Sequence, residues 1–407
     1  MKALTKVAGL ILLMAPSFAF AIPYQLKFHS MRIQQTRENE GDRPYFVTIG
    51  FESILFKQGS TRTFIINTEP NDWVGKSEYN PRRNSNGHLL SEQQTNIPWW
   101  MGESSFRSFS YVTERNLAEV PIIGFAVIAL DNNNTPPNVV RDLLLQVRNN
   151  LKGTLLNQVE RGQIVTGVNL LNHTAVVNAI NERVPQLTNR VLGSLNYNVW
   201  DWTFGSTFNP DKIVGANIAV IPGIRDSVTG SSNGSYTLGD DKFNYSTHWG
   251  PIGNFQNINW LFEGSGGKYR LFGSLTPFVQ PAGNISLIRF TAKSGEDDLR
   301  KNSQIEATIW GNGKKHIIQE AFLKRGVPKY SENSVSHTMP PGWKISDILS
   351  MDLRKISGKT GPLDSFDNWD MCAIKIEVKI GTRWYPLYLD SDYPVHRFGG
   401  IYHIQIQ

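Results

Sequence analysis

Short runs of β-forming residues, each closed by a turn, recur along most of the 407-residue chain. Residues 44–51 are rich in β-formers and partly alternate between apolar and polar side chains, and residues 120–130 form an apolar run of strand length. The 35 glycines and 21 prolines supply turns, and only 19% of the residues are charged, which disfavours long surface helices. The sequence therefore predicts a mainly β protein.

One segment departs from this pattern and has the spacing of helices. Apolar residues recur every three or four positions over residues 140–155 and again over residues 176–191, with a glycine-bounded break at 162–167. We expect a helical hairpin at about residues 137–193 that packs against one sheet. Its faces are not rich in Lys, Arg or Trp, which argues against insertion into a membrane.

The chain is long enough for more than one domain. Residues 276–283 contain two prolines and a glycine and are typical of a linker. We expect two β-sandwich domains, the first at residues 22–275 with the helical hairpin inserted in it. The second domain is expected at residues 284–407, where five or more short strands fit a sandwich.

The first 21 residues have the composition of a secretory signal peptide. Lys2 and Lys6 precede an apolar run at residues 7–14 that is too short to span a bilayer, and Ala19 and Ala21 supply small residues before a cleavage site. We therefore expect a secreted, extracellular protein. The formal net charge of +6 is mildly basic, which permits contact with an anionic surface without requiring it.

The second domain contains an ordered series of motifs. A strand at residues 288–291 is followed by residues 295–301 (Gly-Glu-Asp-Asp-Leu-Arg-Lys), and residues 367–371 (Asp-Asn-Trp-Asp-Met) precede the strand at 373–376. This order resembles the PLAT-like β-sandwich modules of secreted bacterial proteins, whose signature runs Gly-Asp-Asp-Leu-Arg-Gly and then Asp-Asn-Trp-Asn. Lys301 stands where those modules have glycine. The resemblance covers the last third of the chain and implies the sandwich fold.

The first domain resembles a C2-like β-sandwich with a helical insertion. The resemblance depends on residues 40–46 ahead of a strand, on residues 200–201 and 209–215, and on the Gly266-Gly267-Lys268-Tyr269 hairpin. In C2-like domains, acidic loops at one end of the sandwich hold calcium. The resemblance thus implies calcium ligands at Asp42, Asp201 and Asp211, although residues 209–215 are less acidic than the family pattern.

Acidic residues also cluster in two loops of the second domain. Calcium takes about six to eight oxygen ligands, mostly from carboxylates and carbonyl groups. Two acidic loops that converge could supply them, or the same residues could cap turns and pair with Arg300. Both interpretations stay open. The predicted ligands here are Glu296, Asp297, Asp298, Asp367 and Asp370.

Aromatic and basic pairs mark candidate ligand-binding loops. The Trp99-Trp100 pair follows a proline; exposed indoles stack on sugars or lie at a lipid headgroup boundary, whereas buried ones fill a core. Two basic pairs, Arg82-Arg83 and Lys314-Lys315, are predicted to attract phosphate or anionic lipid, unless each is only a solvated loop.

The sequence gives little support for catalysis. The eight histidines are scattered outside metalloprotease spacings, and no Gly-x-Ser-x-Gly elbow is present. Cys372 is the single cysteine, which excludes an intramolecular disulfide and zinc sites built on paired cysteines. Its neighbour Met371 and the apolar strand that follows favour a buried, inert thiol.

These features favour a secreted, non-enzymatic binding protein that acts at a membrane surface. Its partner would be anionic lipid or a membrane-associated protein, with calcium assisting and no nucleic acid involved. One alternative is a carbohydrate-binding adhesin or host-directed virulence factor that uses exposed tryptophans. A second alternative is a hydrolase whose site the sequence does not reveal.

Overall fold

A computed structural model gives the structure of the chain, and it describes most residues beyond the N-terminus. The described ranges are 22–66, 88–112, 117–133, 135–169, 211–225, 227–238, 241–278, 281–295, 297–300, 303–322, 326–356, 369–392 and 395–406, with scattered residues between 172 and 186. The predicted signal peptide, residues 1–21, lies outside the described residues.

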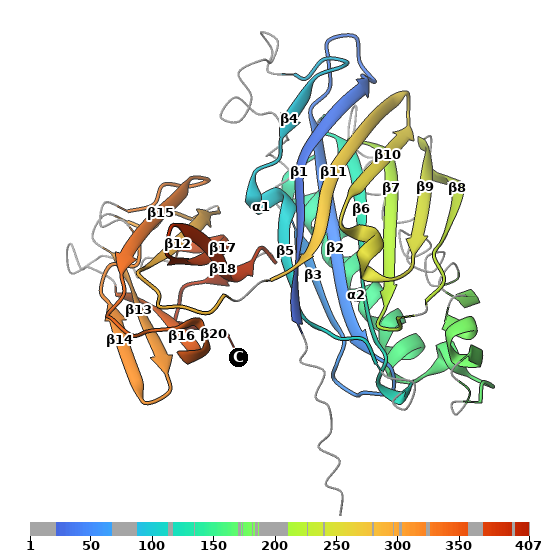
Figure 1. The fold of residues 1–407 in the computed structure, drawn as a ribbon. Coiled ribbons are helices and arrows are strands. Elements are labelled where there is room, and N and C mark those ends of the chain that lie inside the picture. Colours follow the sequence, from blue (N-terminus) through green and yellow to red (C-terminus); the bar gives the residue numbers. More distant parts are fainter. Residues whose placement is uncertain are drawn as a thin grey trace, which may run out of the picture.

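The predicted fold class is confirmed: the structure is mainly β, with one unit before Pro277 and another from Leu287 onward (Figure 1). Among the described residues, every strand pairing stays within one of these two units.

The first unit is built on one sheet of eleven strands in the described part of the chain. Its strand order is β3-β2-β6-β7-β9-β10-β11-β1-β4, with β5 paired to β1 and β8 paired to β9. The strands are β1(Ile22–Gln35), β2(Pro44–Ile54), β3(Arg62–Ile66), β4(Gln94–Asn96), β5(Glu103–Phe109), β6(Pro121–Asp131), β7(Lys212–Pro222), β8(Gly230–Leu238), β9(Asp241–Trp249), β10(Ile258–Gly264) and β11(Gly267–Pro277).

This sheet folds over to make two layers, because β9 and β10 are paired only where Gly264 meets Phe243. The inner layer consists of β3, β2, β6, β7, β9 and β8, and the opposite layer consists of β10, β11, β1, β4 and β5. Strand β6 lies in the inner layer and is buried along its whole length, as its apolar run predicts. Its side chains alternate between two cores. Ile122 and Ile128 face the helical side, whereas Phe125 packs with the strands of the opposite layer, β1, β10 and β11.

The helical insertion covers the outer face of the inner layer. Helix α2(Pro137–Leu155) places Val140, Leu144, Val147 and Leu151 in the core beneath it, which is the predicted spacing. The expected second helix is described mainly at residues 174–180, and residues 187–193 lie outside the described part. Short helical segments complete the chain: α1(Trp99–Gly102), η1(Leu117–Glu119), η2(Leu156–Glu160), η3(Gln163–Val165), η4(Ile252–Phe255) and η5(Ile345–Asp347).

The second unit is a sandwich of two sheets around one core, which contains the fully buried Trp369. One sheet has the order β15-β12-β17-β18, with β19 paired to β17, and the other has the order β14-β13-β16-β20. The strands are β12(Leu287–Ser294), β13(Gln304–Gly311), β14(Lys314–Ile318), β15(Glu332–Thr338), β16(Ile348–Ile356), β17(Asp370–Ile380), β18(Arg383–Asp390), β19(His396–Arg397) and β20(Ile401–Gln405). Cys372 on β17 is buried, as expected.

The two units touch along one side. In Figure 1, α1 and β5 of the first unit lie toward β17 and β18 of the second. Ala373 of β17 belongs to the apolar core of the first unit, so the contact includes buried apolar surface. No helix in the described part of the chain is long and apolar enough to cross a membrane.

Candidate functional site

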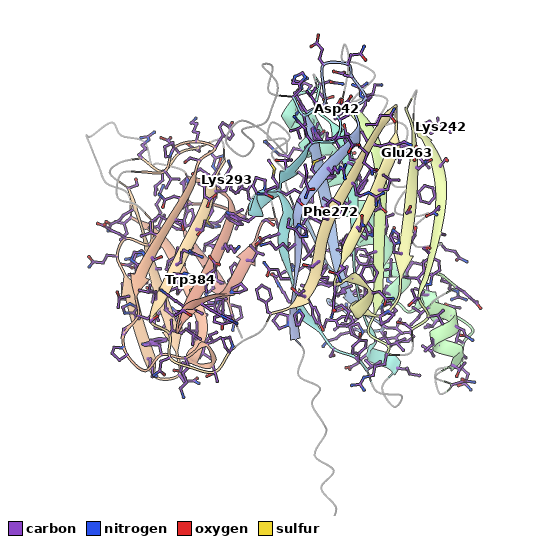
Figure 2. All side chains as sticks on the ribbon, turned by 45° about the horizontal axis from the view of Figure 1, so that its top comes forward. Asp42, Lys242, Glu263, Phe272, Lys293 and Trp384 are labelled. Carbon is purple, nitrogen blue, oxygen red and sulfur yellow. The ribbon has the colours of Figure 1, made fainter. Side chains whose placement is uncertain are left out.

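Three buried carboxylates lie at one end of the first domain's inner layer. Asp42 precedes β2, Asp131 ends β6 and Asp211 precedes β7, and each is no more than 2% exposed. Figure 2 shows Asp42 at the end of the long strands, away from the second domain. Asp42 and Asp211 are two of the predicted calcium ligands, whereas the sequence analysis overlooked Asp131; the third predicted ligand, Asp201, lies outside the described residues.

Hydrogen bonds from the chain itself occupy these carboxylates. Asp42 accepts the backbone N–H groups of Arg37 and Glu38 and, at 2.7 Å, the hydroxyl of Tyr269. Asp211 accepts the N–H of Asn133 at 2.7 Å and the hydroxyl of Tyr45 at 2.8 Å. The carboxylates thus fix loops onto strand ends, and a calcium ion would have to displace or share these donors.

Asp131 has a strongly raised pKa. Burial and the negative charge of Asp42 raise the pKa of Asp131 to about 7, against the opposing effect of the Arg43 N–H and the Arg37 guanidinium. The Arg37 Nε donates to Asp131 at 3.1 Å. Asp131 therefore keeps its proton to a higher pH than an exposed aspartate does.

The acidic loops of the second domain contain an ion pair. Arg397 lies 3.8 Å from a carboxylate oxygen of Asp297 and 3.6 Å from one of Asp370, so it bridges the two predicted loops. Asp298 is half-buried, and Glu296 and Asp367 lie outside the described residues. In the part of the chain that the structure describes, no group of three His, Cys, Asp or Glu residues is arranged to hold a metal ion. Calcium stays a prediction.

The structure places Trp99 and Trp100 at the contact between the domains. Trp100 is 7% exposed, and the two indoles pack edge to face at 5.9 Å. The ammonium of Lys293 on β12 lies 4.6 Å from the Trp100 ring, and that of Lys375 on β17 lies 5.8 Å from the Trp99 ring. A sugar or lipid could stack on Trp100 only if the two domains separated.

A buried carboxylate completes this contact. Glu103 on β5 accepts from Lys375 at 2.8 Å and pairs with Lys27 of its own domain at 2.7 Å. Burial raises the pKa of Glu103, but Lys375 and Lys27 outweigh it and leave that pKa below its ordinary value. Ser391 also donates to the Glu103 backbone carbonyl at 2.8 Å. The segment around Trp99 therefore positions one domain on the other.

An exposed aromatic surface lies on the outer face of the sheet β14-β13-β16-β20. We call it the Trp310 face, and it comprises paired residues whose side chains point away from the core: Glu306, Thr308, Trp310, Lys315, Ile317, Ser350, Asp352, Arg354, Ile401, His403 and Gln405. Trp310, Ile317 and Ile401 are 39%, 45% and 57% exposed. This face combines apolar area with cationic groups and with the carboxylates of Asp352 and Glu306.

Local contacts hold the Trp310 indole in place. Its Nε1 donates to Asp352 at 2.8 Å, and the ammonium of Lys315 lies 4.6 Å from the ring centre. The second predicted lysine, Lys314, instead pairs with Asp347 at 3.1 Å and donates to the Gly342 carbonyl. The two lysines after the Asn-Gly turn thus have different partners: Lys315 contacts Trp310, and Lys314 contacts Asp347.

The sequence analysis did not name Trp310 as a candidate residue. The alternation of apolar and polar side chains from Gln304 to Gly311 could have predicted its exposure. Ile305 and Ile309 face the core, and Trp310 therefore faces outward. The other predicted basic pair, Arg82 and Arg83, lies outside the described residues.

Comparisons with known proteins identify no family for this chain. No protein-family model matches the sequence, and no curated protein matches it. Among solved structures, the alpha toxin from Clostridium absonum is similar over 31% of this chain and 33% of the toxin chain, with 14% sequence identity and a TM-score of 0.21. The similarity spans about a third of the toxin's length, and a TM-score this low supports no argument about function.

Proposed function

We propose that this chain is a secreted, non-enzymatic binding protein that attaches to anionic membrane surfaces through the Trp310 face. The observation that carries the proposal is the exposed Trp310 with Lys315 over its ring and Ile317 on the neighbouring strand. An amphipathic indole favours the boundary between lipid headgroups and acyl chains, and nearby cations favour anionic headgroups.

The expected attachment is weak and depends on salt. Each Lys or Arg near an anionic leaflet contributes about 1 kcal/mol, and burial of an apolar side chain about 1.5–3 kcal/mol. Arg354 is partly neutralised by Glu306, at 3.2 Å, which leaves Lys315 as the main cation of the face. A few such contacts support reversible binding, as for a single lipid anchor.

Vesicle flotation tests the proposal. Wild type should float with vesicles of phosphatidylcholine and phosphatidylserine and stay behind with phosphatidylcholine alone. Trp310→Ala and Lys315→Glu should each lower the floated fraction several-fold. The matched controls, Val228→Ser and Lys242→Glu, alter an exposed apolar and an exposed basic residue of the first domain and should float normally. Equal losses in all four variants would refute a role for this face.

Calcium assistance is tested in the same assay. If the acidic loops hold calcium, EGTA should lower flotation and added calcium should restore it. Flotation that is indifferent to EGTA would separate lipid attachment from calcium.

Carbohydrate binding is a second candidate, supported by a groove in the first domain. The groove lies beside β8, β9 and β10, has a volume of about 430 Å³ and is lined by His248, Trp249, Trp260 and Asn257, among others. Trp249 is half-buried and offers aromatic surface beside amide and hydroxyl groups, whereas Trp260 is buried with the His248 ring stacked on it at 5.2 Å. A glycan array tests this candidate: a signal that Asn257→Ala removes would favour it over lipid attachment.

A further inference from the structure

A pocket of about 460 Å³ lies between the two domains. Strand β5 of the first domain contributes Phe106 and Arg107, and β18 of the second contributes Leu387 and Tyr388. The volume is in the range of sites for small organic ligands, and such sites are frequent at domain contacts. Neither domain forms this pocket alone.

The lining of the pocket combines apolar and polar side chains. Its apolar lining residues with some exposed surface are Leu387 and Ile406, which are half-buried, and Phe278, which is 8% exposed. Burial of an aliphatic or aromatic group against these side chains would contribute about 25 cal/mol for each Å² of apolar area removed from water.

The polar groups that line the pocket are cationic or neutral. Arg62, Arg107 and His403 line it, and none of its described lining residues is a carboxylate. Acidic groups contact these lining residues: Glu52 pairs with Arg62 at 3.3 Å and accepts the backbone N–H of Arg107 at 3.0 Å, and Asp390 accepts the hydroxyl of Tyr388 at 3.0 Å. Asp352 holds His403 at 2.6 Å and raises its pKa, which favours the charged form of that imidazole.

We infer that this interdomain pocket binds a small amphipathic carboxylate, with its apolar body against Leu387 and Ile406 and its anionic group at Arg107 and Arg62. The pocket shares His403 and Gln405 with the Trp310 face, but the inference depends on Arg62 and Arg107, which are not part of that face. A guanidinium group offers the planar, paired N–H donors that match a carboxylate. Because the ligand would touch both domains, binding would also favour the closed arrangement in which they meet.

Calorimetric titration with octanoate, below its micelle concentration, tests the inference. The full-length protein should bind one octanoate per chain, and 1-octanol and octylammonium, of the same length, should bind at least ten-fold more weakly. Loss of one charge-assisted hydrogen bond corresponds to about ten-fold in affinity. Octanol binding as tightly as octanoate, or no octanoate binding, would overturn the inference.

Variants connect the binding to this pocket. Arg107 is exposed, so Arg107→Gln should leave the fold intact and weaken octanoate binding about ten-fold, and Arg107→Glu should abolish it. Lys242→Gln, at the far end of the first domain (Figure 2), is the control and should bind normally. Unchanged binding in Arg107→Gln would assign the octanoate to another place and end the proposal.

The two proposals fail separately. Lys315→Glu should lower vesicle binding and keep octanoate binding, whereas Arg107→Gln should show the reverse. Leu387→Trp, with its fold checked by circular dichroism, fills the pocket and should also lose octanoate. Retained binding in this variant, once folded, contradicts the assignment.

Discussion

Glu103 on β5 and Lys375 on β17 form an ion pair of 2.8 Å that joins the two domains. The Glu103 side chain is only 4% exposed, and Lys27 supplies a second ammonium at 2.7 Å. A carboxylate buried between two cations keeps its charge only while both partners stay in place. Glu103 thus helps to fix the relative position of the domains.

Replacement of Glu103 should therefore destabilise the protein. Glu103→Gln leaves two cations without their counter-ion, and we expect a loss of about 3–5 kcal/mol in the free energy of unfolding. Urea denaturation measures it. The control, Glu263→Gln, removes an exposed partner of Lys268 at 2.7 Å and should cost less than about 1 kcal/mol. Equal losses would contradict a special role for Glu103.

Trp100→Ala should open the contact between the domains. The change removes a large buried side chain that faces Lys293, and we expect a loss of about 3–5 kcal/mol. Quenching of the remaining tryptophan fluorescence by acrylamide should rise as Trp99 becomes accessible. The sequence analysis predicted that Trp99 and Trp100 bind a ligand. If the native protein binds a sugar and only Trp100→Ala removes that binding, the result would support ligand binding by the indole over a role in positioning the domains.

The pH dependence of stability should contain a contribution from Asp131. Burial raises the pKa of Asp131 to about 7, so the folded state holds this proton more tightly than the unfolded chain, whose aspartates titrate near about 3.9. The contribution is full below that lower pKa and is lost as the pH rises toward 7.

Asp131→Asn isolates this contribution, because an amide does not titrate. From pH 5 to pH 8 the free energy of unfolding of wild type should fall by on the order of 2 kcal/mol more than that of the variant. Chemical denaturation at both pH values gives the difference, which cancels any constant cost of the substitution. Parallel pH profiles would show that Asp131 is ionised in the folded state throughout this range.

Two glycines should respond oppositely to alanine. A Cβ at Gly50 on β2 would overlap the ring of Phe64 on the paired strand β3, so Gly50→Ala should cost about 1–3 kcal/mol. A Cβ at Gly153 in α2 would meet no atom within 4 Å apart from its chain neighbours and its own helix backbone, so Gly153→Ala should stabilise the helix by about 0.5–1 kcal/mol. Thermal melting of both variants tests the pair, and a stable Gly50→Ala would show that Phe64 moves aside.

In the elements that were predicted correctly, the apolar positions of the sequence pattern are the positions that the fold buries. The apolar run before Asp131 became a strand covered on both faces, and the three-to-four spacing from Val140 became a helix on that sheet. The last third of the chain became a sandwich. In each case neighbouring residues carry the pattern, so contacts distant in sequence were not needed to recognise it.

The candidate sites depended on distant contacts. The sequence around Trp99 does not show whether its indole lies at a loop tip or in a contact between domains. The contact that distinguishes the two is with Lys375, which is more than 270 positions away in the chain. Likewise Asp42 has the composition of a metal ligand, but the hydroxyl of Tyr269 and two local N–H groups occupy it.

By itself, the amino-acid sequence determined which segments become strands and helices, because alternation and helical spacing fix the faces that must leave water. The folded chain alone decided which aromatic and charged groups meet. It enclosed Trp100 and Glu103 between the domains and left Trp310 exposed, since burial of an indole or a carboxylate depends on partners that only the closed structure brings within reach.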